Sequence, residues 1–146
     1  MKSKLTLVLI ITAISAFLFS CSPTPTQISV GASCDDFGEQ QHISKQVEVA
    51  VGDSFTVTLC SNPSTGFQWT ESAQIGDQTV LKQTDHKSVA PEAKGDKLPA
   101  PGTPGQEVWT FKALKKGTSS VSMEYSRSWE GGEKGVWTFN LTVVVK

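Results

Sequence analysis

Apolar and polar side chains alternate along most of the chain after residue 42, and this period of two constrains the fold more than any other feature. The last alternating run is the longest. Its apolar positions are Trp137, Phe139, Leu141, Val143 and Val145. Because successive side chains of a β-strand point to opposite faces, such a run predicts a strand with one buried face. No run after residue 20 has the period of an amphipathic helix, so this part of the chain is predicted to be all-β.

Together the alternating runs predict an immunoglobulin-like β-sandwich of about seven to eight strands. The strand runs are residues 43–51, 54–60, 67–71, 107–111, 121–125 and 137–145. In the first run, the residues expected to face inward are Ile43, Val47, Val49 and Val51. Residues 79–89 have a weaker pattern and could hold one or two short strands of the second sheet. We therefore expect one domain over residues 41–146, with Trp109 and Trp137 in its core.

The chain begins with a basic segment followed by an apolar run over residues 5–19. This run is shorter than the roughly 20 residues of a membrane-spanning helix and has the proportions of a signal peptide. It ends in Leu18-Phe19-Ser20-Cys21, which resembles the lipobox of bacterial lipoproteins. The resemblance implies a signal peptide over residues 1–20 and a lipid on Cys21 that anchors the exported chain to a bacterial membrane. An ordinary signal peptide with an incidental cysteine is the alternative. Residues 21–40, which begin with a Pro/Thr/Ser-rich stretch, are expected to be a flexible tether.

Two cysteines remain after Cys21, namely Cys34 and Cys60. An even pair in an exported chain predicts a disulfide. A reactive thiol is the less favoured alternative, since no basic residue flanks Cys60 and two aspartates follow Cys34. No cysteine pair has metal-ligand spacing, and His42 and His86 are expected on the surface. We therefore expect no metal and no cofactor.

The charge of the chain argues against nucleic acid as a partner. Without Lys2 and Lys4 of the signal peptide, 11 basic and 14 acidic residues give a net charge of −3. Proteins that bind the phosphate backbone are usually basic.

Three loops carry the unusual residues. The hexapeptide Asn62-Pro63-Ser64-Thr65-Gly66-Phe67 separates two predicted strands. Asn62 can cap the turn through its side-chain oxygen, Pro63 presets φ, and Gly66 can adopt positive φ. The turn is longer than a reversal needs, with two hydroxyls near its tip, so both a structural turn and a functional tip remain open.

The other two loops are residues 90–106, which are rich in proline and glycine, and residues 126–135. Loops of this length are usually functional or disordered. In a sandwich, alternate connections emerge at the same end. The three loops are alternate connections of the predicted strands, so all three are expected to crowd one end.

The three loops resemble the motifs of the chagasin-like inhibitors of papain-like cysteine proteases. The first loop is similar to that family's Asn-Pro-Thr-Thr-Gly-Tyr/Phe motif. Gly102-Thr103-Pro104-Gly105, ahead of a Trp-x-Phe strand, resembles its Gly-x-Gly-Gly motif. Arg127-Ser128-Trp129-Glu130 resembles its Arg-Pro-Trp/Phe motif, in which an acidic residue often follows. Pro104 and Ser128 depart from the family pattern, so the second loop cannot take the same turn and the third is expected to be looser.

The resemblance implies a reversible protease inhibitor whose three loops form a wedge in the active-site cleft of a papain-like cysteine protease. Ser64 and Thr65 would lie nearest the catalytic cysteine. Trp129 would be an exposed anchor on the rim, with Arg127 and Glu130 making polar contacts around it. Phe67 is expected both to close the loop and to pack beneath it. Such an inhibitor can act as a monomer.

Two other functions remain as alternatives. An enzyme is disfavoured because no Ser/His/Asp or Cys/His constellation is visible in the sequence. A non-catalytic surface adhesion or ligand-binding module is compatible with the same fold, because fold alone does not determine function.

Overall fold

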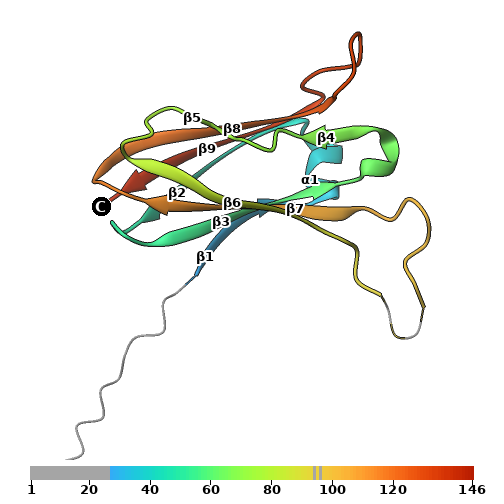
Figure 1. Cartoon of the computed structure of the whole chain (residues 1–146), viewed down its shortest axis with the longest axis horizontal. Helices are drawn as coiled ribbons and strands as arrows, with labels where there is room; N and C mark the ends of the chain where they lie inside the picture. The colour runs from blue at the N-terminus through green and yellow to red at the C-terminus, as the bar shows by residue number, and fades with distance from the viewer. Residues whose placement is uncertain (1–26, 94, 96) are drawn as a thin grey trace, which may run out of the picture.

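The computed structural model describes residues 27–93, 95 and 97–146, which form two β-sheets packed face to face (Figure 1). This confirms the predicted all-β sandwich. The predicted signal peptide and Cys21 lie outside the described residues. Within the described ranges, no helix is long and apolar enough to cross a membrane.

The elements follow one another as short strands, with one short α-helix and one turn of 3₁₀-helix. In chain order they are β1 Ile28–Ala32, α1 Cys34–Glu39, β2 His42–Val49, β3 Ser54–Ser61, η1 Pro63–Thr65, β4 Phe67–Trp69, β5 Gln74–Ile75, β6 Leu81–Val89, β7 Gly105–Ala113, β8 Gly117–Arg127 and β9 Trp137–Val145.

One sheet has the strand order β1-β3-β7-β6, and the other has the order β2-β9-β8-β4, with β5 also paired to β8. Most neighbouring strands are antiparallel. The exceptions are the edge strands β1 and β2, which run parallel to β3 and β9. In each sheet the parallel edge strand pairs with a strand that does not follow it directly in the chain, β1 with β3 and β2 with β9, so both edges depend on non-local pairing.

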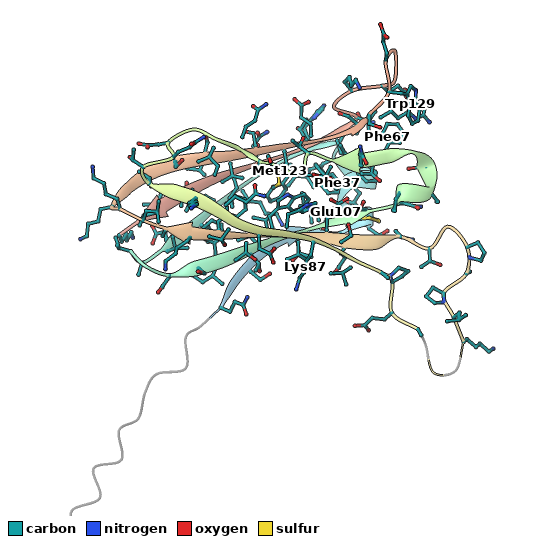
Figure 2. The ribbon with its side chains drawn as sticks, in the orientation of Figure 1. Phe37, Phe67, Lys87, Glu107, Met123 and Trp129 are labelled. Carbon is teal, nitrogen blue, oxygen red and sulfur yellow. A yellow bond between two sulfur atoms is a disulfide. The ribbon has the colours of Figure 1, made fainter. Side chains whose placement is uncertain are left out.

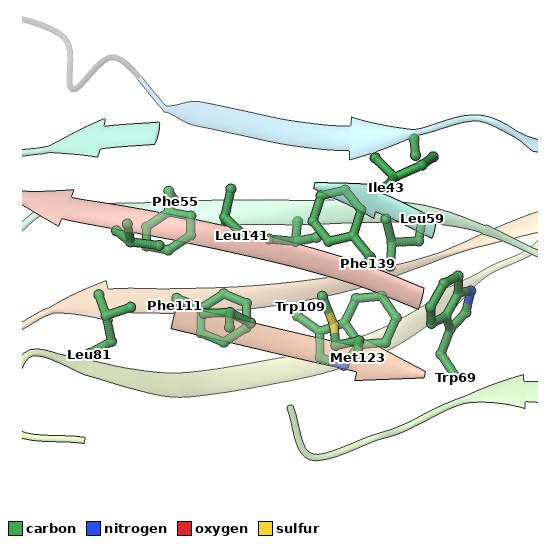
Figure 3. Packing of buried hydrophobic residues seen from close by; sticks show 14 of the residues in the cluster. Ile43, Phe55, Leu59, Trp69, Leu81, Trp109, Phe111, Met123, Phe139 and Leu141 are labelled. Atoms are coloured by element: carbon green, nitrogen blue, oxygen red, sulfur yellow. The ribbon is translucent and has the colours of Figure 1, made fainter. Parts of the chain in front are cut away.

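The core lies between the sheets and is made by the inward faces of the alternating strands. In β3, Phe55, Val57 and Leu59 are completely buried, as the sequence pattern predicts. Figure 3 shows Phe55, Phe111, Trp109 and Trp69 packed in the same layer. Burying each such side chain contributes on the order of 2 kcal/mol. The prediction for Trp109 is confirmed, whereas Trp137 is only partly buried against the edge of the core.

The predicted tether over residues 21–40 is wrong from Ile28 onward. Strand β1 pairs with β3 from Ile28 opposite Phe55, and α1 follows it directly. Ser33 begins the helix with a capping box: its hydroxyl accepts the backbone N–H of Asp36, whose carboxylate accepts the backbone N–H of Ser33. Phe37 is 1% exposed and belongs to the core. A strand of five residues and a helix of six are too short to give a clear periodic signal.

The hydrogen bonds of the capping box affect the titration of its carboxyl group. The backbone N–H of Ser33, and then its hydroxyl, hold the pKa of Asp36 below its ordinary value. A lowered pKa in the folded state means that this stabilisation is present above the ordinary carboxyl pKa and is lost as the pH falls through the lowered one.

Three further details differ from the sequence prediction. Of residues 79–89, Leu81–Val89 form one strand, β6, with an irregularity in its pairing between Gln83 and Asp85, and the two-residue strand β5 was not predicted. Glu71 lies beyond β4, where its carbonyl oxygen accepts the indole N–H of Trp109. Val51 does not face the core, because the chain turns there after β2.

The predicted disulfide between Cys34 and Cys60 is present, with 5.2 Å between the Cα atoms. It joins the first residue of α1 to the penultimate residue of β3. The bond therefore fastens the helix to the strand that leads into the first of the three loops.

Replacing both cysteines, as Cys34→Ala/Cys60→Ala, should lower the free energy of unfolding by about 3 to 4 kcal/mol, because the bond closes a loop in the unfolded chain. Urea unfolding of the oxidised wild type and the double variant would measure the difference. The wild type unfolded with a reducing agent is the control and should match the double variant. A loss below about 1 kcal/mol would contradict the expected role of the bond.

Candidate functional site

Three connections meet at one end of the sandwich (Figure 1). Loop 1 is residues 62–66 between β3 and β4, loop 2 is residues 90–104 between β6 and β7, and loop 3 is residues 128–136 between β8 and β9. The connections β4–β5 and β5–β6 separate loop 1 from loop 2, so the three loops are not strictly alternate connections. All three still lie at the same end, so the expectation that they share one end is confirmed. Contacts between the loops decide whether the three form one surface.

Loop 1 is a single turn of 3₁₀-helix. Pro63 occupies its first turn, and Gly66 ends it in the left-handed conformation with φ of +78°. The N–H of Gly66 donates to the carbonyl of Pro63, and the N–H of Thr65 donates to the carbonyl of Asn62. The predicted roles of Pro63 and Gly66 are thus confirmed, since φ is set by the ring of one and by the missing Cβ of the other.

The two hydroxyls at the tip point back into the turn. Ser64 Oγ donates to Asn62 Oδ1 over 2.6 Å, and Thr65 Oγ1 donates to the carbonyl oxygen of Asn62 over 2.7 Å. The side-chain oxygen of Asn62 therefore accepts from a hydroxyl and not from the backbone, unlike the predicted cap. Because both hydroxyl hydrogens are used inside the loop, the exposed hydroxyls offer chiefly their lone pairs to a partner.

Loop 1 is held from below by Tyr125 of β8. The backbone N–H of Asn62 donates to the buried hydroxyl of Tyr125 over 2.8 Å. Close by, the indole N–H of Trp69 donates to the carbonyl of Cys60 over 2.8 Å. Sequence reasoning found Tyr125 only as an inward-facing residue. A tyrosine among apolar inward residues, two positions before Arg127, is the signal that its hydroxyl needs a buried partner.

A hydrogen bond from Asn62 joins loop 1 to loop 2. The side-chain amide of Asn62 donates to the carbonyl of Gly102 over 2.9 Å. Gly102 has φ of +83° and follows Pro101 in a turn closed by the N–H of Thr103 donating to Ala100. The positive φ thus falls at Gly102 and not at Pro104, so the proline does not disturb the turn.

Gly105 lies at the base of loop 2, where it begins β7. A Cβ at this position would lie 2.4 Å from the carbonyl oxygen of Val89, so only glycine lets the two strands meet there.

Loop 3 is joined to loop 1 through Arg127. Its guanidinium carbon lies 4.4 Å from the centre of the Phe67 ring and 5.4 Å from that of Trp129, so the cation lies against both aromatic rings. Its ion pair is with Glu133, at 3.3 Å, and not with Glu130. Arg127 therefore makes these contacts within the protein, whereas the sequence predicted that it would make polar contacts with the protease around Trp129.

Loop 3 is closed by its own backbone. The N–H of Arg127 donates to the carbonyl of Glu133 over 2.8 Å, and the ammonium group of Lys134 donates to the carbonyls of Arg127 and Trp129. These bonds compensate for the proline that Ser128 replaces. Ser128 and Glu130 are exposed, and Trp129 is 51% exposed, as predicted.

Trp129 packs over the flat face that Gly66 provides. A Cβ on Gly66 would lie 2.7 Å from the indole Cη2 of Trp129. The glycine is thus needed twice, for its left-handed φ and for this contact. Figure 2 shows Trp129 and Phe67 close together at this end of the molecule.

A buried carboxylate lies below loops 1 and 2. Glu107 is 7% exposed, and its two oxygens are bonded to Ser61 Oγ at 2.7 Å and His86 Nε2 at 2.8 Å. The His86 ring stacks on Trp109 with 4.8 Å between centroids, so His86 is not the simple surface residue that was expected. Because its partners satisfy the carboxylate, this cluster has a structural role beneath the site.

The site lies on the loops at one end of the sandwich, and nothing in the described part of the chain suggests metal chemistry there. Within that part, no group of three or more His, Cys, Asp and Glu side chains could hold a metal ion. One exposed residue was missed by the sequence reasoning. Leu98 of loop 2 is 87% exposed. A single exposed apolar side chain is common on protein surfaces and does not by itself assign a role to Leu98.

Comparison with known proteins gives consistent results. The family model described as Chagasin family peptidase inhibitor I42 matches residues 48–143. Amoebiasin-2 of Entamoeba histolytica (strain ATCC 30459 / HM-1:IMSS / ABRM) is 27% identical over 100 residues, which cover 68% of this chain and 76% of that protein.

Solved structures share the fold. The cysteine protease inhibitor EhICP2 from Entamoeba histolytica superposes with a TM-score of 0.60 at 22% identity, over 84% of this chain and 100% of that one. PbICP-C, solved in complex with falcipain-2, gives a TM-score of 0.52 at 15% identity, over 80% of this chain and 99% of that one.

Replacing Gly66 by alanine should destabilise the protein by more than the roughly 1 kcal/mol expected for a side chain at positive φ, because the new methyl group also displaces Trp129. Urea unfolding would measure the stability, and acrylamide quenching of tryptophan fluorescence would report the exposure of the indole. Gly52→Ala is the matched control, since Gly52 has φ of +87° with no atom within 4 Å of an added Cβ. Equal effects of the two substitutions on stability and quenching would show that the contact with Trp129 is unimportant.

Proposed function

The chain belongs to the chagasin family of peptidase inhibitors, and we propose that it is a reversible inhibitor of papain-like cysteine proteases that inserts loops 1, 2 and 3 into the active-site cleft. The observation that carries this proposal is the joining of the three loops into one edge. Asn62 bonds loop 1 to loop 2, and Arg127 lies between Phe67 of β4 and Trp129 of loop 3. A preformed edge loses little conformational entropy on binding.

In this mechanism loop 1 enters nearest the catalytic cysteine. Its backbone is a hydrogen-bonded helical turn, whereas a protease substrate must present an extended peptide. The carbonyls of Asn62 and Pro63 already accept hydrogen bonds within the loop. Cleavage would require the turn to open and its carbonyl oxygen to exchange these bonds for the donors of the protease's oxyanion hole, so the loop fills the cleft without being readily cleaved.

Trp129 acts as the anchor on the rim of the cleft. It is large, half exposed and held in place by Gly66 and Arg127, which are the properties of a binding hot spot. Ser64 and Thr65 offer hydroxyl lone pairs, and Gly102–Gly105 and Glu130 lie on the flanks. A contact of about 800 Å² per partner is enough for tight binding by an edge of this kind.

Membership of an inhibitor family favours a non-catalytic role. The adhesion alternative uses the same fold but requires no effect on a cysteine protease. An assay of papain activity therefore distinguishes an inhibitor from an adhesion module. An assay of generic ester and peptide hydrolysis by the protein itself distinguishes an inhibitor from an enzyme.

We further propose that residues 1–20 are a lipoprotein signal peptide and that a lipid on Cys21 anchors the exported protein to a bacterial membrane. The position of β1 supports an orientation in which the three loops face away from the membrane. Ile28 pairs with Phe55 at the start of β3, whereas loop 1 follows the end of that strand. An anchor before β1 thus joins the sandwich at the end opposite the three loops and leaves the loops facing away from the membrane.

The full chain, purified in detergent, should inhibit papain in titration at submicromolar concentration, and activity should return on dilution. Trp129→Ala should raise the inhibition constant at least about tenfold through loss of the anchor. The control is Leu114→Ala, at an exposed residue just beyond the far end of β7, which should change the constant by less than about twofold. No inhibition by the wild type at micromolar concentration would reject the function.

The anchor is tested separately. Cys21→Ala expressed in a bacterial host should move the protein from the membrane fraction to the soluble fraction, and metabolic labelling with a fatty-acid analogue should disappear. Cys34→Ala/Cys60→Ala is the control and should keep both the label and the membrane association. Labelling of the Cys21 variant would mean that the lipid lies elsewhere.

A further inference from the structure

A continuous stack of rings runs from α1 to Phe67, the residue that follows loop 1. Phe37 stacks on Trp137 with 4.9 Å between ring centroids, and Trp137 stacks on Tyr125 at 4.8 Å, with planes within 13° in both pairs. Tyr125 stacks on Phe67 at 5.6 Å. The guanidinium of Arg127 lies against the Phe67 ring at the outer end of the stack. We call Phe37, Trp137, Tyr125 and Phe67 the aromatic column.

The outer part of the column sets the positions of loops 1 and 3. Tyr125 accepts the backbone N–H of Asn62 where loop 1 begins, and Phe67 follows Gly66 where loop 1 ends. Arg127 is the last residue of β8 before loop 3, and Trp137 is the first residue of β9 after it. A shift of the Tyr125 or Trp137 ring would therefore move the ends of both loops.

The inner end of the column is fastened by α1. Phe37 is buried, and it also packs against Trp69 at 5.3 Å. The disulfide at Cys34 and the capping box between Ser33 and Asp36 both hold the first turn of the helix in place. Trp69 is in turn bonded to β3, because its indole N–H donates to the carbonyl of Cys60, the residue that forms the disulfide with Cys34.

We propose that Phe37 is a positioning residue of the inhibitory edge, and that α1 belongs to the binding machinery although it lies outside residues 48–143, which match the family. The proposal rests on the proposed function. The ring contacts of Phe37 are with Trp69 of β4 and Trp137 of β9. Phe37 closes the inner face of Trp137 and so keeps Trp137 and Tyr125 in the stack that carries Asn62, Phe67 and Arg127. Without this support the loops must be ordered at the moment of binding, which weakens binding and speeds dissociation.

The test compares Phe37→Leu with Phe55→Leu in the full chain. Both residues are buried phenylalanines in a stacked pair, but Phe55 stacks on Phe111 at the start of β3, far from the loops. Both variants should lose similar stability. Phe37→Leu should raise the inhibition constant for papain about threefold to tenfold, mainly through faster dissociation, because it removes a stacked partner of the column. Phe55→Leu should leave the constant within about twofold.

A second readout is independent of any protease. Hydrogen exchange of the Asn62 amide, which is bonded to Tyr125, should be faster in Phe37→Leu than in Phe55→Leu under conditions where both are folded. The near-ultraviolet circular dichroism of the stacked Tyr125 and Trp137 rings should also decrease only in Phe37→Leu.

The outcomes separate the two proposals. If the wild type does not inhibit papain, the proposed function fails, and the exchange of the Asn62 amide alone decides whether Phe37 positions loop 1. If the wild type inhibits papain but Phe37→Leu and Phe55→Leu have equal inhibition constants and equal Asn62 exchange, Phe37 is only a core residue and the positioning role is overturned.

Discussion

Trp69 joins the two sheets directly beneath the three loops, and the geometry of the site depends on this packing. The residue belongs to β4 of one sheet, and its indole donates to the carbonyl of Cys60 in β3 of the other. Its ring contacts Trp109 edge to face at 6.4 Å and Tyr125 at 5.1 Å. Such ring pairs add specific geometry to the burial of apolar area. The strands that lead into loops 1 and 3 are thus held at a defined spacing by one buried side chain.

Above this layer, the loops are stiff because each is closed on itself and then bonded to its neighbour. Loop 1 is a helical turn, loop 2 is held by Asn62, and loop 3 is closed by Lys134. Few of these contacts involve strong ion pairs. Stiffness comes from hydrogen bonds between backbone and side chains and from the stacking of Arg127 between two rings, which together leave an exposed indole and several exposed polar groups ready to bind.

The N-terminal segment has a larger part in this arrangement than its composition suggests. Strand β1 adds an edge to one sheet, and α1 brings Phe37 and Cys34 to the base of the site. The two ends of this segment lie at opposite ends of the sandwich. Strand β1 begins at the end remote from the loops, where the proposed membrane anchor would join the domain, and α1 packs beneath the loops through Phe37.

The sequence by itself determined the fold class, the buried faces of the long strands, the disulfide pair and the three loops with their shared end. All of these follow from local signals: a period of two, the pair of cysteines that remains after Cys21, turn residues and the alternation of connections in a sandwich. Only the tertiary structure decided that β1 and α1 belong to the domain, that Arg127 pairs with Glu133 and lies against Phe67, and that Phe37 supports Tyr125 through Trp137. These features depend on which residues meet across sheets, and register, twist and side-chain packing set such contacts, which no local pattern encodes.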